Sequence, residues 1–231
     1  MDNFSSIRCV VFDLDDTLWP CEPVIVNAEI ALYEWFKEHY PRISNQYSLE
    51  DVRKQRTNFA LRNPHIAHDV TALRKQSLLE LAQEFDYPMG LASDGLALFR
   101  KHRNKVSLFD DALPTISKLR EHFSTGVITN GNADLNAIGL SEYFNFIVTA
   151  EEAGAAKPDK TIFELAQKKI NLSSHELLYV GDHPIIDVLG SNSSGWKSLW
   201  FNPYSEPWME DVKPDAEIQS LSEIPSLLLC I

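Results

Sequence analysis

Short hydrophobic runs alternate with longer amphipathic stretches along this chain of 231 residues. Continuous apolar runs that are too short for helices and rich in β-branched side chains are typical of buried strands. Five such runs predict strands at residues 9–12, 126–129, 146–149, 177–181 and 198–201. Between the later strands, residues 160–169 and 185–194 have helical character. This alternation predicts an α/β fold with a doubly wound parallel sheet, whose strands all end at one edge.

The interval between the first two predicted strands has a different character. About a hundred residues separate Asp16 from Gly126, which is far too many for a simple connection. Apolar residues at helical spacing predict four helices in it, near residues 24–39, 48–61, 69–85 and 90–102. Ser48 and Asp51 have the spacing of a capping box at the start of the second helix. We therefore expect a smaller all-helical domain at 19–108, inserted into a core of residues 1–18 and 109–231.

The composition is that of an ordinary globular protein with an acidic surface. A net charge of −12 argues against nucleic acid or an anionic membrane as the main partner. Three cysteines, Cys9, Cys21 and Cys230, are few and odd in number, which fits a reducing compartment. No stretch approaches the roughly 18 apolar residues of a membrane span, and no secretory signal is evident. We expect a cytoplasmic monomer that binds neither nucleic acid nor membrane.

Polar side chains suited to phosphoryl chemistry follow four of the five predicted strands. In chain order they are Asp13 and Asp15, then Thr129 and Asn130, then Lys157, and finally Asp182 and Asp187. Taken singly, each has an ordinary explanation, because Asp caps helices or begins turns and a lysine is usually solvated. Together they would place carboxylates, a hydroxyl and a cation at the edge where open α/β sheets bind ligands.

These four groups resemble the four motifs of the haloacid dehalogenase-like phosphatases. The family pattern is DxDx[TV], a hydrophobic run that ends in Ser or Thr, a Lys, and GDxxxxD. In this chain the matching residues are Asp13 to Thr17, Thr129, Lys157 and Gly181 to Asp187. A helical insert directly after the first motif is similar to the C1-type cap of that family. The resemblance implies a Rossmann-like core with a helical cap.

The resemblance also implies catalytic and metal-binding roles for the acidic residues. Asp13 would attack phosphorus and form an aspartyl-phosphate, while Asp15 would act as general acid and then general base. Mg²⁺, or Mn²⁺ in its place, would be held by the Asp13 side chain, the Asp15 backbone carbonyl and Asp182. Asp187 resembles the second acid of the last motif, which would support the metal waters or Lys157.

The same resemblance implies a phosphate site. Thr129 would donate its hydroxyl to a phosphoryl oxygen, Asn130 would contribute a backbone N–H, and Lys157 would neutralise the transferring group. Asp16 is expected to be a turn residue, and Thr17 a residue with a local hydrogen bond.

Family membership alone leaves several reactions open, because dehalogenases, phosphonatases and phosphomutases share this scaffold. A dehalogenase needs neither the second acid of the first motif nor a metal, so Asp15 and Asp182 favour phosphoryl transfer. No lysine of the insert stands out as the Schiff-base former of a phosphonatase. A phosphomutase and a non-catalytic protein that binds small molecules remain alternatives.

One segment of the insert bears on the substrate, which we expect to be a small phosphorylated metabolite. Residues 65–71, with Arg74 beyond them, resemble the cap segment of bacterial phosphatases for flavin mononucleotide and 5-amino-6-(5-phosphoribitylamino)uracil. Alternative substrates are sugar phosphates, nucleotides and phosphoglycolate. The simpler interpretation of His68 and Asp69 is that they begin a cap helix.

Overall fold

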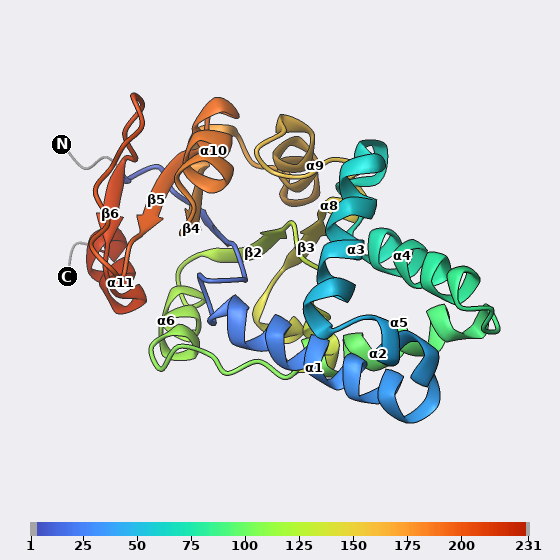
Figure 1. Ribbon diagram of the computed structural model, residues 1–231. Helices are drawn as coiled ribbons and strands as arrows, with labels where there is room; N and C mark the ends of the chain where they lie inside the picture. The colour runs from blue at the N-terminus through green and yellow to red at the C-terminus, as the bar shows by residue number, and fades with distance from the viewer. Residues whose placement is uncertain (1–3, 230–231) are drawn as a thin grey trace. The chain divides into compact units, whose positions relative to one another are not determined.

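The computed structural model describes residues 4–229 and contains a six-stranded parallel sheet (Figure 1). The strand order is β3-β2-β1-β4-β5-β6. The strands are β1 (Cys9–Phe12), β2 (Ser124–Thr129), β3 (Phe146–Thr149), β4 (Leu177–Gly181), β5 (Lys197–Phe201) and β6 (Ala216–Ile218). The predicted α/β fold is confirmed, and β6 is an additional short edge strand. Cys230 lies outside the described residues.

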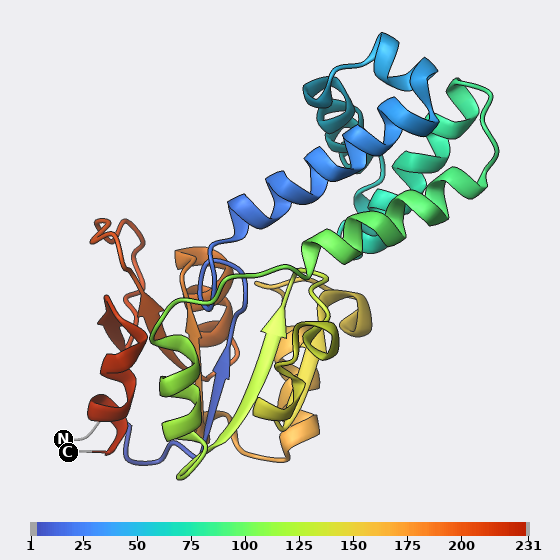
Figure 2. The ribbon, with the colours of Figure 1, turned by 90° about the horizontal axis from the view of Figure 1, so that it is seen from below.

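The parallel register aligns the strand ends that carry the polar residues. Phe12, the last residue of β1, pairs with Val127 of β2 and Val180 of β4. The arrowheads of β1 and β2 point the same way in Figure 2. All four residues of β1 are fully buried, as expected for a central strand covered on both faces.

Helices cover both faces of the sheet. α6 (Ala112–Leu119) and α11 (Ile224–Leu229) pack together on one face, and α9 (Lys160–Ile170) and α10 (Gly190–Ser193) lie on the other (Figure 2). Phe163 of α9 packs edge-on against Tyr179 of β4 and Trp196, which closes the second face. A further short helix, α8 (Ala150–Ala153), follows β3.

The insert after β1 is all-helical, as predicted. Its helices are α1 (Cys21–His39), α2 (Pro41–Gln46), α3 (Leu49–Arg62), α4 (Val70–Glu84) and α5 (Gly90–Arg103). The capping box of Ser48 and Asp51 begins α3, and Asp69 caps α4 by accepting a bond from Ala72 N–H at 2.7 Å. The α2 helix was not predicted. Within residues 4–229, no helix is long and apolar enough to cross a membrane.

The chain divides into two compact units, and the helical unit contains a second segment that we did not expect. The sheet unit comprises 1–20, 107–131 and 139–231, and the helical unit comprises 21–106 together with 132–138. In the helical unit, Asn132 donates to Thr71 Oγ1 at 3.3 Å, and Asp134 N–H donates to Asn104 Oδ1 at 3.0 Å. The second segment, which includes α7 (Leu135–Ile138), follows directly after Gly131. From the sequence we expected this segment to belong to the core.

The helix predicted after β4 begins with a wide turn. Residues Pro184–Leu189 form a π-helix, which α10 continues. Asp187 N–H and Val188 N–H both donate to the His183 carbonyl oxygen, at 3.0 and 3.3 Å. Such wide turns occur mostly as single insertions, frequently at functional sites. Here the π-helix carries Asp187 of the last motif.

Gly126 provides a test of packing in the sheet. A Cβ atom at this position would lie 2.2 Å from the ring of Phe146, whereas one at Gly90 would have no heavy atom within 4 Å. Overpacking a core costs about 1–3 kcal/mol, so Gly126→Ala should lower the urea midpoint of unfolding. Gly90→Ala is the matched control and should leave stability unchanged or slightly raised. Equal midpoints for the two variants would contradict this packing.

Candidate active site

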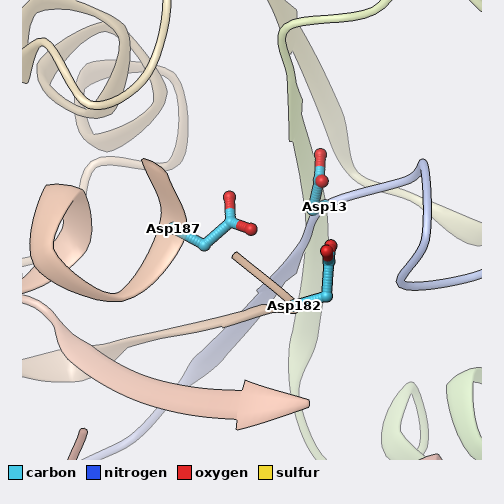
Figure 3. A group of neighbouring side chains, drawn as sticks. All are labelled: Asp13, Asp182 and Asp187. Atoms are coloured by element: carbon cyan, nitrogen blue, oxygen red, sulfur yellow. The ribbon is translucent and has the colours of Figure 1, made fainter. Parts of the chain in front are cut away.

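Three carboxylates meet at the carboxyl edge of the sheet (Figure 3). Asp13 directly follows β1, and its N–H still donates to the Val180 carbonyl of β4 at 2.9 Å. Asp182 follows β4, and Asp187 comes from the π-helix. One carboxylate oxygen from each of the three lies within 4.8 Å of the other two. The structure thus brings together Asp13 and the two acids of the last motif.

Lys157 lies against this cluster and is only 3% exposed. Its Nζ contacts Asp13 Oδ1 at 2.8 Å, Asp187 Oδ1 at 2.7 Å and the Tyr179 hydroxyl at 2.7 Å. An ammonium group has three N–H donors, and these contacts supply three acceptors. Because a buried charge is costly unless it is paired, the two carboxylates are what allow the ammonium to be buried here.

Asn130 holds the backbone of Lys157. Its Oδ1 accepts a bond from Lys157 N–H at 2.7 Å, and its Nδ2 donates to the Lys157 carbonyl at 3.0 Å. This reciprocal pair joins the loop after β2 to the loop that carries the lysine. The Asn130 side chain is therefore committed to positioning Lys157, so a contact with phosphate would use its backbone N–H.

Asp187 reaches the cluster because β4 ends in a glycine. A Cβ atom on Gly181 would lie 2.4 Å from Asp187 Cγ, so any side chain there would displace the carboxylate. The second oxygen of Asp187 accepts a bond from His183 N–H at 2.9 Å. The imidazole Nδ1 of His183 accepts bonds from two N–H groups at the start of the π-helix. The imidazole thus has a structural role, as a cap.

The loop after Asp13 folds back on itself and fixes Asp15. Trp19 Nε1 donates to Asp15 Oδ1 at 2.9 Å, and Asp16 adopts the left-handed conformation with a φ of 59°. Asp16 is thus a turn residue, as expected. Thr17 was expected to bond locally, but its hydroxyl donates to Asp182 Oδ1 at 3.0 Å. That prediction was wrong because the loop curls back toward the end of β4.

Thr129 ends β2, and its hydroxyl accepts a bond from Gly131 N–H at 2.9 Å. A hydroxyl that accepts a bond still has a hydrogen to donate. A cavity of about 170 Å³ is lined by all the residues for which the sequence predicts a catalytic, metal-binding or phosphate-binding role, namely Asp13, Asp15, Thr129, Asn130, Lys157, Asp182 and Asp187. All of them belong to the sheet unit.

Carboxylates outnumber cations at the site. Three carboxylates lie close together, and the one ammonium group contacts two of them, Asp13 and Asp187. Burial raises the pKa of Asp13 well above its usual range, although the ammonium of Lys157 opposes the shift. Burial, and after it the charge of Asp187, raise the pKa of Asp182 to about 7. The donor set is hard oxygen with an excess of negative charge, which suits Mg²⁺.

Two residues that contact the site, Tyr179 and Trp200, were not predicted from the sequence. Tyr179 is buried in β4, and its hydroxyl donates to the Ile128 carbonyl at 2.9 Å while it accepts from Lys157. Trp200 of β5 is the second, and its Nε1 donates to the Asp182 carbonyl at 2.7 Å. An aromatic residue in an apolar run gives no sign of such a bond. The sequence shows only that a strand predicted to be fully buried carries a Tyr O–H or a Trp N–H, and such a group usually has a hydrogen-bond partner.

The sequence profile of the haloacid dehalogenase-like hydrolases matches residues 7–195. The chain therefore belongs to this family, and the resemblance seen in its motifs is confirmed. The prediction of an enzyme of the phosphatase and hydrolase class is confirmed with it.

Two relatives are similar to this chain, one along almost its whole length and the other along half of it. The 5-amino-6-(5-phospho-D-ribitylamino)uracil phosphatase YigB of Escherichia coli is 30% identical over 96% of both chains. The pyrimidine 5'-nucleotidase YjjG of Escherichia coli is 33% identical over 51% of this chain and 55% of its own.

Solved structures have the same fold. A 2-haloacid dehalogenase from Pseudomonas syringae pv. tomato DC3000 has a TM-score of 0.91 and 36% identity, covering 97% of this chain and 99% of that one. The HAD-hydrolase YfnB of Bacillus subtilis, whose structure contains magnesium, has a TM-score of 0.70 over 96% of this chain and 99% of its own. At 23% identity, the second similarity shows the fold alone.

Tyr179→Phe tests the hydrogen bond to Lys157. It removes one acceptor from a buried ammonium, and bonds to charged groups contribute about 1.5–3 kcal/mol. We expect phosphate release to fall about tenfold or more, mainly through kcat, in protein that remains folded. Tyr204→Phe is the control, since Tyr204 is 78% exposed. An unchanged kcat in Tyr179→Phe would show that the hydroxyl does not matter to Lys157.

The raised pKa of Asp182 predicts a pH dependence of metal binding. Below about pH 7, a proton occupies this carboxylate in the metal-free protein and competes with Mg²⁺. The affinity should be fully present above pH 7 and fall by up to about tenfold per pH unit below it. Calorimetric titration with Mg²⁺ on both sides of neutrality measures this, with Asp182→Asn as the variant that should lose binding. A dissociation constant that does not change with pH would contradict the prediction.

Proposed function

We propose that this protein is a magnesium-dependent phosphomonoester hydrolase that works through an aspartyl-phosphate at Asp13. The observation that carries the proposal is the position of the Asp13 carboxylate. It lies at the carboxyl edge of the sheet, 2.8 Å from the buried ammonium of Lys157 and beside two further carboxylates. A carboxylate is repelled by an anionic phosphate ester, so it can attack only where positive charge is concentrated.

In the first step, an oxygen of Asp13 forms a bond to phosphorus while the bond from phosphorus to the ester oxygen breaks. Lys157 stabilises the negative charge of the transferring group. Thr129 and the backbone N–H of Asn130 would donate to its oxygens, from the cavity that they line with Asp13. Asp187 and Tyr179 orient Lys157 for this role.

Asp15 carries the proton in both steps. Its carboxyl protonates the departing ester oxygen, and its carboxylate then takes a proton from the water that attacks phosphorus and releases Asp13. The indole of Trp19, 2.9 Å from Asp15 Oδ1, keeps this side chain in one orientation.

Mg²⁺ held by Asp13, Asp182 and the Asp15 carbonyl would supply the charge neutralisation that lets a carboxylate approach phosphate. Mn²⁺ suits the same oxygen ligands. Magnesium in the related YfnB structure is consistent with this choice.

For the substrate, we propose a small phosphorylated metabolite of the riboflavin pathway, 5-amino-6-(5-phosphoribitylamino)uracil or flavin mononucleotide. The similarity to YigB over 96% of the chain supports the first of these. Asp69 caps α4, so its side chain is engaged in the helix. Relatives named as pyrimidine nucleotide and glyceraldehyde 3-phosphate phosphatases make nucleotides and sugar phosphates the alternatives.

Hydrolysis of 2-haloacids is the second candidate, because the structure with 36% identity is named a 2-haloacid dehalogenase. In that reaction Asp13 would attack carbon and displace a halide. Asp15 and Asp182 would then have no chemical role, although both line the cavity with Asp13. This is why we favour the phosphatase.

Release of inorganic phosphate from a panel of esters tests the proposal. The panel contains 5-amino-6-(5-phosphoribitylamino)uracil, flavin mononucleotide, pyrimidine nucleotides, sugar phosphates and phosphoglycolate, each with Mg²⁺, with Mn²⁺ or with a chelator. We expect metal-dependent release that Asp13→Asn lowers at least about a thousandfold. Asp159→Asn is the control with the same chemical change, since Asp159 caps α9 and Asn caps equally well.

Halide release from 2-chloropropionate is measured beside the panel. Phosphate release from a nucleotide or sugar phosphate in preference to the ribityl esters would replace the proposed substrate and keep the mechanism. Halide release without phosphate release, by the metal-loaded and folded protein, would overturn the proposed function in favour of the dehalogenase.

A further inference from the structure

A second group of buried charges lies in the helical unit. Glu29 of α1 is 6% exposed and faces three arginines from α3 and α4. The contacts join Arg53 Nε to Oε2 at 2.6 Å, Arg56 Nη2 to Oε1 at 2.9 Å and Arg74 Nη2 to Oε1 at 3.6 Å. We call these four side chains the arginine pocket.

Positive charge is in excess in the arginine pocket. Arg53 also faces the exposed carboxylate of Glu50 at 3.8 Å, so these ion pairs set three guanidinium groups against two carboxylates. Arg56 and Arg74 share a single oxygen of Glu29. Burial, and then the charge of Arg56, lower the pKa of Arg74 to about 9, although Glu29 opposes the shift. Arg74 is thus still charged at neutral pH, and a partly compensated buried cation is costly.

Arg74 cannot relieve this excess by turning toward solvent. Its guanidinium carbon lies 3.4 Å from the ring centroid of Phe99, in a cation–π contact, and its side chain is 9% exposed. The side chain of Arg56 also lines the pocket, and it is 35% exposed, so solutes can reach it. The positive charge is therefore fixed in place, with one side open to solutes.

A small cavity adjoins these charges. Its volume is about 20 Å³, and its remaining walls are mostly apolar, including Leu32, Phe36, Leu78 and Leu81. A cavity of this size holds one water-sized occupant, since a water needs roughly 10–15 Å³ by the same measure. A water molecule could fill the space but could not neutralise the charge. An anion of similar size could do both.

We propose that the arginine pocket binds one small monovalent anion of the chloride class. Arg56 and Arg74 would hold the anion, and the apolar walls would strengthen its attraction by excluding water. The cavity is too small for an organic phosphate or a carboxylate with a carbon body. This site shares no residue with the phosphoryl site, so the proposal does not depend on the proposed function.

Broadening of the ³⁵Cl resonance by the full-length protein tests the proposal directly. We expect excess linewidth that bromide displaces with a single dissociation constant. In Arg56→Gln that dissociation constant should rise about tenfold or more, because one charged donor is lost. Arg62→Gln is the matched control. Arg62 also lies on α3, but it pairs with Glu80 at 2.8 Å and does not line the cavity.

Glu29→Gln should change the affinity for chloride in the opposite direction. This variant removes the carboxylate that competes for Arg56 and Arg74, so chloride should bind more tightly than to the unchanged protein. Far-ultraviolet circular dichroism checks the fold of each variant. If Glu29→Gln does not fold, the comparison of Arg56→Gln with Arg62→Gln tests the proposal by itself. Linewidths that are equal in Arg56→Gln and Arg62→Gln would overturn the proposal and assign the cavity to water. Crystals soaked in bromide should show one anomalous peak beside Arg56, and no peak there would overturn it as well.

Discussion

The contact between one buried ammonium and its acceptors is the constraint on which the rest of the active site depends. Three carboxylates within 4.8 Å of one another would repel strongly in a buried setting, and the charge of Lys157 offsets part of that cost. Its acceptors come from the end of β1 and, far along the chain from β1, from β4 and the π-helix that follows it. Only a parallel sheet with aligned carboxyl ends brings these segments to one place. The charge compensation at the site therefore depends directly on the topology of the sheet.

Features of the backbone bring Lys157 and its acceptors into contact. Gly181 leaves room for Asp187, and the wide turn of the π-helix turns this residue back toward β4. Asn130 fixes the main chain of Lys157 from a neighbouring loop, so the lysine is held at both its backbone and its tip. Groups held in this way need little rearrangement during a reaction, which is the basis of electrostatic preorganisation. The residues that we propose to contact the substrate are few, and the residues that hold them in place are positioned by equally specific contacts.

The strands, the insert and the motif residues could be predicted from the sequence because each has a local signal. Continuous apolar runs mark β1 and β4, and helical periodicity marks α1 and α4. Contacts between distant side chains have no such signal. The bond from Thr17 to Asp182 and the bond from Trp200 to the Asp182 carbonyl depend on how loops and strands come together. The short elements α2 and β6 were missed because a few residues show no clear period.

The segment 132–138 makes the helical unit more than a simple insertion. The chain passes between the two units at four points, after residues 20, 106, 131 and 138. An exchange of residues 21–106 alone with those of a relative would remove Thr71 and Asn104, which bond to Asn132 and Asp134. Divergence within the family would then have to alter the two segments together. The module that evolution or an engineer can transplant is therefore discontinuous, and its smaller piece begins directly after Gly131, at the end of the loop that carries Asn130.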